Sequence, residues 1–406
     1  MSAESGKDGV RARMGRIVPG IVLLFALAHF AHHLVTAVPV PLLPFIRDEF
    51  NLDYTRAALV VSAFSVPYGF SQLPAGWLAD RFGPRRLILV GISGVSLAGL
   101  AVGLSTSYTM MLVALFIMGA LGGGYHPSAP AAISRVTEPS HRGRALGFHM
   151  IGGSASYFLA PIVAGAVALA WGWRMSFVAL SIPAIAFGFF LFVYLGRRQS
   201  VASVSPPAHG AATAVGETQI DWIRMTALLV LTSATAAVVQ CIVSFIPLYL
   251  VDLHGYAEYN AAFAISLFYS TGLWAAVAGG YLSDRIGRIR VIILAGLLSG
   301  PAVALLDVSG STVAVMGLLL FLGIALYARA PASESYIVTN TPAGKRSTVL
   351  GLYYFGSMEG SGVLAPAIGY LIDHYGFGFS FVVAGISLLV VAAVCAMVLI
   401  RHSGAD

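Results

Sequence analysis

The chain consists of long apolar runs separated by short polar segments, and this pattern is its strongest structural signal. Twelve runs are long enough to cross the hydrocarbon core of a bilayer, which takes about 20 apolar residues in a helix. The expected spans are 17–44, 57–79, 86–106, 109–135, 145–170, 174–196, 223–251, 259–282, 289–308, 312–339, 348–372 and 378–401. The runs do not alternate apolar and polar positions as the strands of a membrane β-barrel do. They therefore predict an all-α membrane protein with twelve transmembrane helices.

A polar segment at residues 197–221 divides these spans into six and six. It is rich in Ser, Pro, Ala and Gly and contains no apolar run, which is typical of a flexible linker. We therefore expect an N-terminal six-helix bundle at 1–196 and a C-terminal six-helix bundle at 222–406, joined by a cytoplasmic linker.

The two expected bundles resemble each other at an offset of 204 residues. The matched pairs include Asp80 and Asp284, Arg81 and Arg285, Gly83 and Gly287, Pro127 and Pro331, Arg142 and Arg346, and Gly172 and Gly376. Apolar sequence of low complexity does not readily match Asp, Arg, Pro and Gly at one fixed offset, so we infer an internal duplication. Two such bundles predict a pseudo-symmetric fold with a substrate site between them, exposed to each side of the membrane in turn.

Composition and charge narrow the class of protein further. Hydrophobic residues make up 58% of the chain and charged residues 10%, against about 45–50% and about 25% in soluble proteins. This excludes a soluble enzyme, a disordered chain and a fibrous protein. With the N-terminus in the cytoplasm, 19 of the 23 Lys and Arg residues fall in cytoplasmic segments. The positive-inside rule then predicts a multi-pass protein of the plasma (inner) membrane with both termini cytoplasmic, and it explains the net charge without a nucleic-acid partner.

The loop between the second and third expected spans combines glycine, acidic and basic residues, and the second bundle repeats it. Glycine permits a tight helix end, a carboxylate can accept hydrogen bonds from the N-terminal end of a neighbouring helix, and arginines are fixed charges at the membrane boundary. The candidate gating residues are Gly76, Asp80, Arg81, Gly83 and Arg85 in the first copy and Gly280, Asp284, Arg285, Gly287 and Arg288 in the second.

This loop resembles the signature of the major facilitator superfamily, G-x-L-A-D-R-x-G-R-R/K, with Pro84 in place of a basic residue. The resemblance covers essentially the whole chain and implies that Asp80 and Arg81 help to hold the bundles together while the cavity faces outward. A closer resemblance is to the fosmidomycin-resistance branch of drug exporters. It rests on Leu27-Ala28-His29, Gly124-Tyr125-His126-Pro127, Gly152-Gly153 with Ala160-Pro161, and Asp373-His374. That branch tends to carry an acid at the position of His33, so the resemblance implies a different proton route here.

Eight ionisable residues fall within the expected spans, where by default such residues face a cavity or a partner. They are His29, His32, His33, His126, His149, Arg329, Glu334 and Glu359. His29 and His33 share one helix face because they are four residues apart, and histidine titrates near neutral pH, which suits reversible proton uptake. Two imidazoles at this spacing can also hold a transition metal. Static hydrogen bonds to neighbouring helices are the third interpretation.

The other intramembrane charges offer similar choices. Glu359 lies among small residues at 356–362 that let helices approach closely, so its desolvated carboxyl group is a candidate proton carrier. Glu334 is a second candidate. The alternative for both carboxyl groups is a static hydrogen bond. Arg329 is expected either to bind an anionic group of the substrate or to neutralise one of these carboxylates. It occupies the repeat position of Tyr125, so the two bundles present unlike groups at matched sites. Tyr125 therefore joins the candidate substrate site.

Together these features predict a proton-coupled secondary transporter of a small organic solute, a drug or a metabolite, with the histidines and Arg329 favouring an anion. No G-x-x-x-x-G-K-[ST] loop for ATP occurs, so the proton gradient is the expected energy source, with no cofactor and no resident metal. The resemblance favours efflux by proton antiport, and uptake by symport is the alternative. A membrane receptor would usually carry a soluble output domain, and the sequence shows none. An intramembrane enzyme would need a nucleophile with a base or a metal site, and no convincing set of such residues is visible. The expected partners are the substrate, protons and the lipid bilayer, and we expect a monomer.

Overall fold

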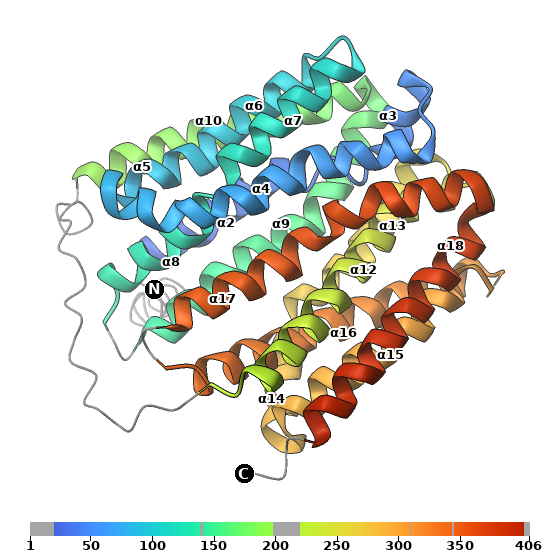
Figure 1. The fold of residues 1–406 in the computed structure, drawn as a ribbon. Helices are drawn as coiled ribbons and strands as arrows, with labels where there is room; N and C mark the ends of the chain where they lie inside the picture. The colour runs from blue at the N-terminus through green and yellow to red at the C-terminus, as the bar shows by residue number, and fades with distance from the viewer. Residues whose placement is uncertain (1–19, 139–140, 198–219, 309, 343–344, 402–406) are drawn as a thin grey trace, which may run out of the picture.

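All regular secondary structure in the described part of the chain is helical. The computed structural model describes residues 20–138, 141–197, 220–308, 310–342 and 345–401, with only the backbone at Gly76, Asp80, Arg135, Ser347, Met358 and Glu359. Figure 1 shows two groups of helices side by side, the first in blue to green and the second in yellow to red. The predicted linker falls mainly on 198–219, outside the described residues, so the division of the chain at 196 and 222 stays a prediction.

In the part of the chain that the structure describes, the first group holds ten helical elements. They are α2 (Gly20–Thr36), α3 (Leu43–Phe50), α4 (Tyr54–Phe82), α5 (Pro84–Leu89), η1 (Val90–Gly94), α6 (Val95–Gly103), α7 (Tyr108–Gly122), α8 (Tyr125–Val136), α9 (Arg142–Trp171) and α10 (Trp173–Arg197). The second group holds nine within the described residues. They are α12 (Trp222–His254), α13 (Glu258–Ser270), η3 (Thr271–Leu273), α14 (Ala275–Ile286), α15 (Arg288–Val308), α16 (Thr312–Thr339), α17 (Arg346–Tyr354), η5 (Phe355–Glu359) and α18 (Gly360–Arg401).

These helices account for the twelve predicted spans. Within the described residues, eight helices are long and apolar enough to cross a membrane, and α13 with α14, bent by 44° at their junction, makes a ninth. The run from Thr348 to Arg401 counts once there but holds two spans, because the chain turns back at Gly376 (Figure 1). The remaining two are α2, with 17 described residues, and the long but more polar α4. The protein is therefore an all-α membrane protein built from two six-helix bundles.

The internal repeat is visible in the backbone. Gly83 and Gly287, which are matched by the repeat, end α4 and α14 with φ values of 82° and 96°, a conformation that glycine adopts without strain. Gly119 of α7 and Gly323 of α16, another matched pair, lie so close to α4 and α13, respectively, that a Cβ would collide with a phenylalanine carbonyl oxygen. Equivalent glycines thus perform the same packing in both bundles, which supports the duplication inferred from the sequence.

The bundles converge at one end of the molecule and diverge toward the other (Figure 1). Across their interface α4 packs along the first part of α18, where the Ser62 hydroxyl donates to the Gly362 carbonyl at 2.6 Å, and α9 packs along α13. We call the end where they meet, which holds the start of α4 and the bend at Gly376, the closed end. The opposite end, which holds the loops at Gly83 and Gly287, is called the motif end.

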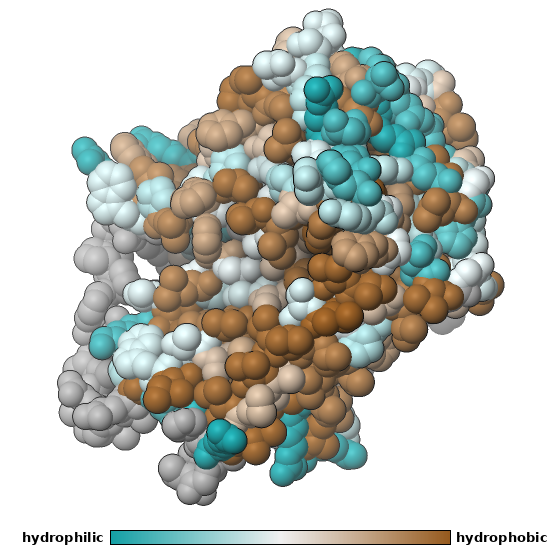
Figure 2. Space-filling model, turned by 45° about the vertical axis from the view of Figure 1, so that its right-hand side comes forward, coloured by the Kyte–Doolittle hydropathy of each residue, from teal (hydrophilic) through white to brown (hydrophobic). Residues whose placement is uncertain are grey.

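The outer surface fits a bilayer. In Figure 2 hydrophobic side chains dominate the middle of the face shown, and hydrophilic ones gather toward its ends. Large apolar side chains on the outer helix faces are fully accessible, such as Val277 at 78% and Val313 at 81%. Contiguous apolar patches of this kind are rare on soluble monomers, whereas in a membrane they contact the acyl chains of lipids.

Candidate functional site

A small polar cavity, called here the central cavity, lies between the two bundles. Its volume is about 100 Å³, which is room for about three water molecules. The polar side chains in its wall are His33, Thr36, Ser65, Tyr68 and Tyr157 from the first bundle and Gln240, Ser244, Tyr269 and Ser361 from the second. Because both bundles contribute, a tilt of one against the other reshapes the cavity. This is the kind of place at which the repeat predicted a substrate site.

The end of α2 shapes one side of the central cavity. The sequence predicted a single bent span to residue 44, but α2 ends at Thr36 and a turn precedes α3. This part of the prediction is wrong because Pro39 and Pro41 lack backbone donors and clash with the preceding turn, which stops the helix rather than bending it. His33 and Thr36, in the last turn of α2, and Pro39 are consequently in the cavity wall.

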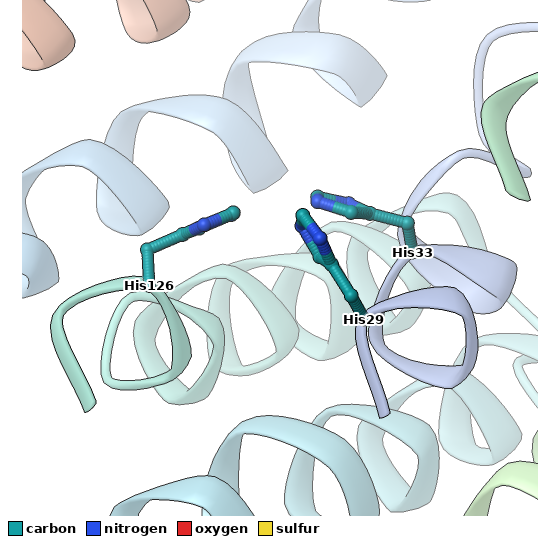
Figure 3. Close-up of side chains that lie close together, drawn as sticks. All are labelled: His29, His33 and His126. Atoms are coloured by element: carbon teal, nitrogen blue, oxygen red, sulfur yellow. The ribbon is translucent and has the colours of Figure 1, made fainter. Parts of the chain in front are cut away.

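Five histidine side chains gather in the core of the first bundle, next to the central cavity. His29, His32 and His33 lie on α2, His126 lies in the first turn of α8, and His149 lies on α9. Figure 3 shows His29 and His33 reaching from α2 toward the space that His126 enters from α8. The four-residue spacing predicted that His29 and His33 share a face. The convergence of the other two helices could not be predicted, because it depends on how three helices pack.

Backbone carbonyl groups orient three of these rings. The Nδ1 of His29 donates to the carbonyl of His149 at 3.0 Å, and the Nδ1 of His149 donates to a carbonyl of α2 at 3.0 Å. The Nδ1 of His32 donates at 2.6 Å to the carbonyl of Gly91, which lies in the π-helical turn η1. Since a carbonyl oxygen only accepts, each of these Nδ1 atoms is assigned a hydrogen, and each Nε2 is an acceptor in the neutral ring.

The free ring nitrogens differ in their surroundings. The Nε2 of His32 accepts from the Tyr68 hydroxyl at 2.9 Å, so this ring is satisfied on both sides. The Nε2 atoms of His29 and His126 are buried and have no hydrogen-bond partner among the described residues, and the same holds for the hydroxyl of Tyr125. Buried polar atoms are nearly always paired in native structures. The unpaired Nε2 atoms therefore indicate a ligand position that the hydrogen bond of His29 Nδ1 leaves open.

Glycines make the space that this cluster occupies. Gly153 on α9 faces the His29 ring, where a Cβ would lie 2.6 Å from Cε1. Between α7 and α8, Gly123 lies against the backbone of Gln72 on α4, where a Cβ would approach the amide nitrogen to 2.7 Å. The helix is interrupted there, and α8 begins at Tyr125. Small residues thus let α2, α4 and α9 approach closely enough to bring the histidines together.

A second polar group lies in the core of the other bundle. Arg329 on α16 is 2% exposed, and its guanidinium interacts with the Tyr353 hydroxyl and with the charge of Glu334. Among the described residues it forms no ion pair with Glu334, and its Nε and Nη1 have no hydrogen-bond partner. Neutralisation of Arg329 by a direct ion pair with Glu334 is therefore not what the structure shows. The side chain of Glu359 lies outside the described residues.

At the motif end, the described arginines contact their own bundle. Arg85 donates to a backbone carbonyl of α10 at 2.8 Å, and Arg288 donates to a threonine hydroxyl at the end of α16 at 2.9 Å. The guanidinium groups of Arg81 and Arg285 lie 5.3 Å and 4.4 Å from an aromatic ring of their own helices. These contacts leave the two bundles free to separate at this end.

The remaining candidate residues of the motif loops are Gly76, Asp80, Gly280 and Asp284. Only the backbone is described at Gly76 and Asp80, so a role of the Asp80 side chain in holding the bundles together stays a prediction. Gly280 has open space around it, and Asp284 is exposed. Neither makes a described contact with the first bundle.

The closed end is held by contacts between the bundles. Asp373 of the second bundle accepts hydrogen bonds from the backbone N–H of Tyr54 at 2.8 Å, from that of Thr55 at 2.9 Å, and from the Thr55 hydroxyl at 2.6 Å. It thereby caps the first turn of α4 from the other bundle. Arg47 of α3 forms an ion pair with Asp252 at the end of α12, and the Asp252 carboxylate also accepts from the Tyr54 hydroxyl at 2.7 Å.

Sequence reasoning missed this set of contacts. Asp373 entered only through the family resemblance, and Arg47 was not among the candidate residues. The sequence signal that could have indicated the ion pair was the opposite charge of Arg47 and Asp252, which lie at the outer ends of spans in different bundles. A further carboxyl pair meets here, because the side chains of Asp48 of α3 and Glu258 of α13 share a hydrogen bond.

Comparison with known proteins gives concordant matches over nearly the whole chain. The profile described as Major Facilitator Superfamily matches twice, over residues 25–273 and over 228–405. A probable sulfoacetate transporter from Cupriavidus necator is 25% identical over 414 residues, covering 95% of this chain and 94% of that protein. A hexuronate transporter from Bacillus subtilis is 23% identical over 387 residues, covering 91% of each. Among solved structures, a POT family transporter in complex with a thioalcohol-conjugated peptide has a TM-score of 0.81 at 13% identity, covering 94% of this chain and 96% of that one.

These matches confirm the predicted resemblance at the level of the superfamily and the predicted fold. They do not reach the fosmidomycin-resistance branch, which stays a prediction. The substrates in the names of the two relatives, sulfoacetate and hexuronate, are both organic anions.

Proposed function

The chain belongs to the Major Facilitator Superfamily, and we propose that it carries a small organic anion across the membrane together with protons. Its relatives are transporters and its fold is that of a transporter, so the protein is a secondary transporter of small organic solutes and not an enzyme. The observation that carries the proposal of an anion is the buried guanidinium of Arg329, two of whose nitrogens lack a partner among the described residues.

An unpaired fixed charge inside a membrane protein is costly unless a ligand offsets it. A carboxylate or sulfonate oxygen would accept charge-assisted hydrogen bonds from Arg329. The solutes in the names of the two relatives, sulfoacetate and hexuronate, contain such groups. Arg329 is not in the wall of the central cavity. However, Tyr327, two residues before it on α16, interacts with Tyr269 of that wall. This contact brings α16 to the wall of the central cavity, and Arg329 lies on a different face of the same helix.

The state of the molecule supports alternating access. The bundles meet through Asp373, Asp252 and Arg47 at the closed end, and the described arginines of the motif loops contact only their own bundle. In the predicted topology the closed end faces the outside of the cell, so this is the inward-facing arrangement. It agrees with the role that the resemblance implies for Asp80 and Arg81, which is to hold the motif end together in the opposite state.

The position of Glu334 supports the proposal of proton coupling. Its carboxyl group lies within a span, interacts with Tyr354 and shares the electrostatic field of Arg329. When an anion binds to the Arg329 guanidinium, its negative charge offsets the positive charge that stabilises the Glu334 carboxylate. Uptake of a proton by Glu334 then becomes favourable. The anion and the proton then cross together. The histidines predicted for the same role lie in the other bundle.

This coupling favours symport over the efflux by antiport expected from the resemblance to drug exporters. A membrane potential that is negative inside opposes entry of each negative charge by about 2.3 kcal/mol per 100 mV. Accumulation of an organic anion therefore needs cations that move in the same direction, and the pair of Arg329 and Glu334 provides for one proton.

Replacing Glu334 with Gln is expected to uncouple transport from the proton gradient. Gln keeps the size of the side chain but takes up no proton, so accumulation driven by a pH gradient in proteoliposomes should fall at least about 10-fold while anion exchange without a gradient persists. Sulfoacetate and a hexuronate are the first substrates to test. Glu138→Gln, an exposed carboxyl group at the motif end, is the matched control. Accumulation by Glu334→Gln at the rate of the unmodified protein would refute the role of Glu334, and outward movement of solute against an inward proton gradient would establish antiport.

A further inference from the structure

We propose that His29, His33 and His126 form a binding site for a divalent first-row transition metal ion. Each ring offers one nitrogen, and the three nitrogens lie within 4.8 Å of one another. The ring centroids are separated by 4.9, 5.3 and 5.3 Å. Three imidazoles around a tetrahedral ion with ordinary bond lengths have centroids about 5 Å apart and nitrogens about 3.4 Å apart. The rings are thus already at the spacing of a metal site, and small rotations bring the nitrogens inward (Figure 3).

The hydrogen bonding of His29 prepares its ring as a ligand. Its Nδ1–H is held by the carbonyl of His149 at 3.0 Å, which leaves the lone pair of Nε2 facing the cluster. Metal-binding histidines commonly donate their other N–H to a backbone carbonyl in this way, which fixes the tautomer and the direction of the ring. His33 is held similarly through the Thr36 hydroxyl, which lies 3.0 Å from its Nδ1.

The unpaired imidazole nitrogens favour a cation that binds three nitrogens at once over a proton shared by two. The Nε2 atoms of His29 and His126 are buried without a hydrogen-bond partner among the described residues. A shared proton bridges two nitrogens, but the three rings are spaced nearly equally, as a single ion at their centre requires. The other two histidines are occupied differently: both ring nitrogens of His32 are hydrogen-bonded, and His149 stacks on His29 with centroids 4.3 Å apart.

The chemistry of the donors limits which ion fits. Imidazole nitrogens suit zinc, copper, nickel and cobalt, whereas calcium and magnesium require oxygen ligands. Three histidines leave the fourth position of a tetrahedral Zn²⁺ for water or an anion. Because His33 is also in the wall of the central cavity, the ion can enter from the cavity. The sequence predicted no resident metal because α2 alone supplies two ligands, and the third comes from α8 only after the helices pack.

Titration of the full-length protein with Zn²⁺ tests this site. The purified protein, freed of metal and of any affinity tag, is expected to bind one equivalent of Zn²⁺, and His126→Ala is expected to weaken binding at least about 100-fold. His374→Ala removes an exposed histidine at the closed end and should bind Zn²⁺ as the unmodified protein does. Absence of stoichiometric binding, or equal affinity in His126→Ala, would overturn the proposal.

A second measurement does not depend on the folding of any variant. Co²⁺ bound to the unmodified protein should give the intense visible absorption of tetrahedral nitrogen coordination, and excess Zn²⁺ should remove it. A weak spectrum typical of octahedral Co²⁺ would overturn the site even if binding were detected. The transport proposal rests on Arg329 and Glu334 in the other bundle, so failure of this test leaves it unaffected.

Discussion

Replacing Arg329 with Met is expected to lower kcat/KM for organic anions at least about 100-fold in proteoliposomes, because a charge-assisted hydrogen bond contributes about 1.5–3 kcal/mol and the field that attracts the anion disappears as well. Met fills a similar volume, so the loss is assigned to the charge. Arg329→Lys keeps the charge but not the planar fork of donors, and it should lose only about 10-fold.

Two controls separate binding from folding in this experiment. Arg290→Met removes an exposed arginine of the same bundle, whose Nη1 donates to the carbonyl of Ile286 at the end of α14, and it should leave transport unchanged. A neutral solute of similar size should be transported by Arg329→Met as poorly as by the unmodified protein. If anions and neutral solutes lost transport equally, Arg329 would have a structural role and the proposal of an anionic substrate would fail.

Asp373→Asn is expected to shift the protein toward the state in which the closed end is open. The variant loses the carboxylate that caps α4 from the other bundle through the N–H groups of Tyr54 and Thr55. Asn keeps only one acceptor oxygen and no charge, and loss of a hydrogen bond to a charged group costs about 1.5–3 kcal/mol, which changes the ratio of the two states about 10- to 150-fold. The cost falls only on the closed state, because the contact joins different bundles.

Asp53→Asn is the matched control for this prediction. Asp53 caps the same helix, accepting from the N–H of Arg56 at 2.7 Å, but it belongs to the same bundle. It should therefore lower stability without changing the ratio of states. Distances between spin labels at Leu104 and Val308, exposed positions on different bundles near this end, measure the ratio. An equal response of the two variants would contradict the assignment of Asp373 to the contact between bundles.

The spans and their order could be predicted because they depend on local composition. Apolar runs and the glycines that end helices are properties of neighbouring residues. The repeat at an offset of 204 residues can be found by comparing two segments of the same sequence. The error in the first span arose where local rules compete, because the prolines after Thr36 stop a helix that hydropathy alone extends to residue 44.

The candidate site could be predicted only in part, for the opposite reason. The shared face of His29 and His33 follows from helical spacing, but the approach of His126 is set by the packing of α8 against α2. The contact of Asp373 with Tyr54 joins residues more than 300 positions apart in the chain. No pattern along the sequence contains such information, since opposite charges at the ends of spans can pair in many ways.

The most direct test of alternating access is a reversible crosslink across the closed end. Gly165 of α9 and Ala262 of α13 lie on different bundles near this end, and a Cβ at Gly165 would be 3.1 Å from the Cβ of Ala262, within a few tenths of an ångström of the Cβ–Cβ separation in a disulfide. The pair is introduced after replacement of the buried Cys241 and Cys395 by Ala. Oxidation is expected to stop transport nearly completely, and reduction to restore it. Transport at the full rate by the crosslinked protein would contradict the claim that the two bundles must separate at this end to move their substrate.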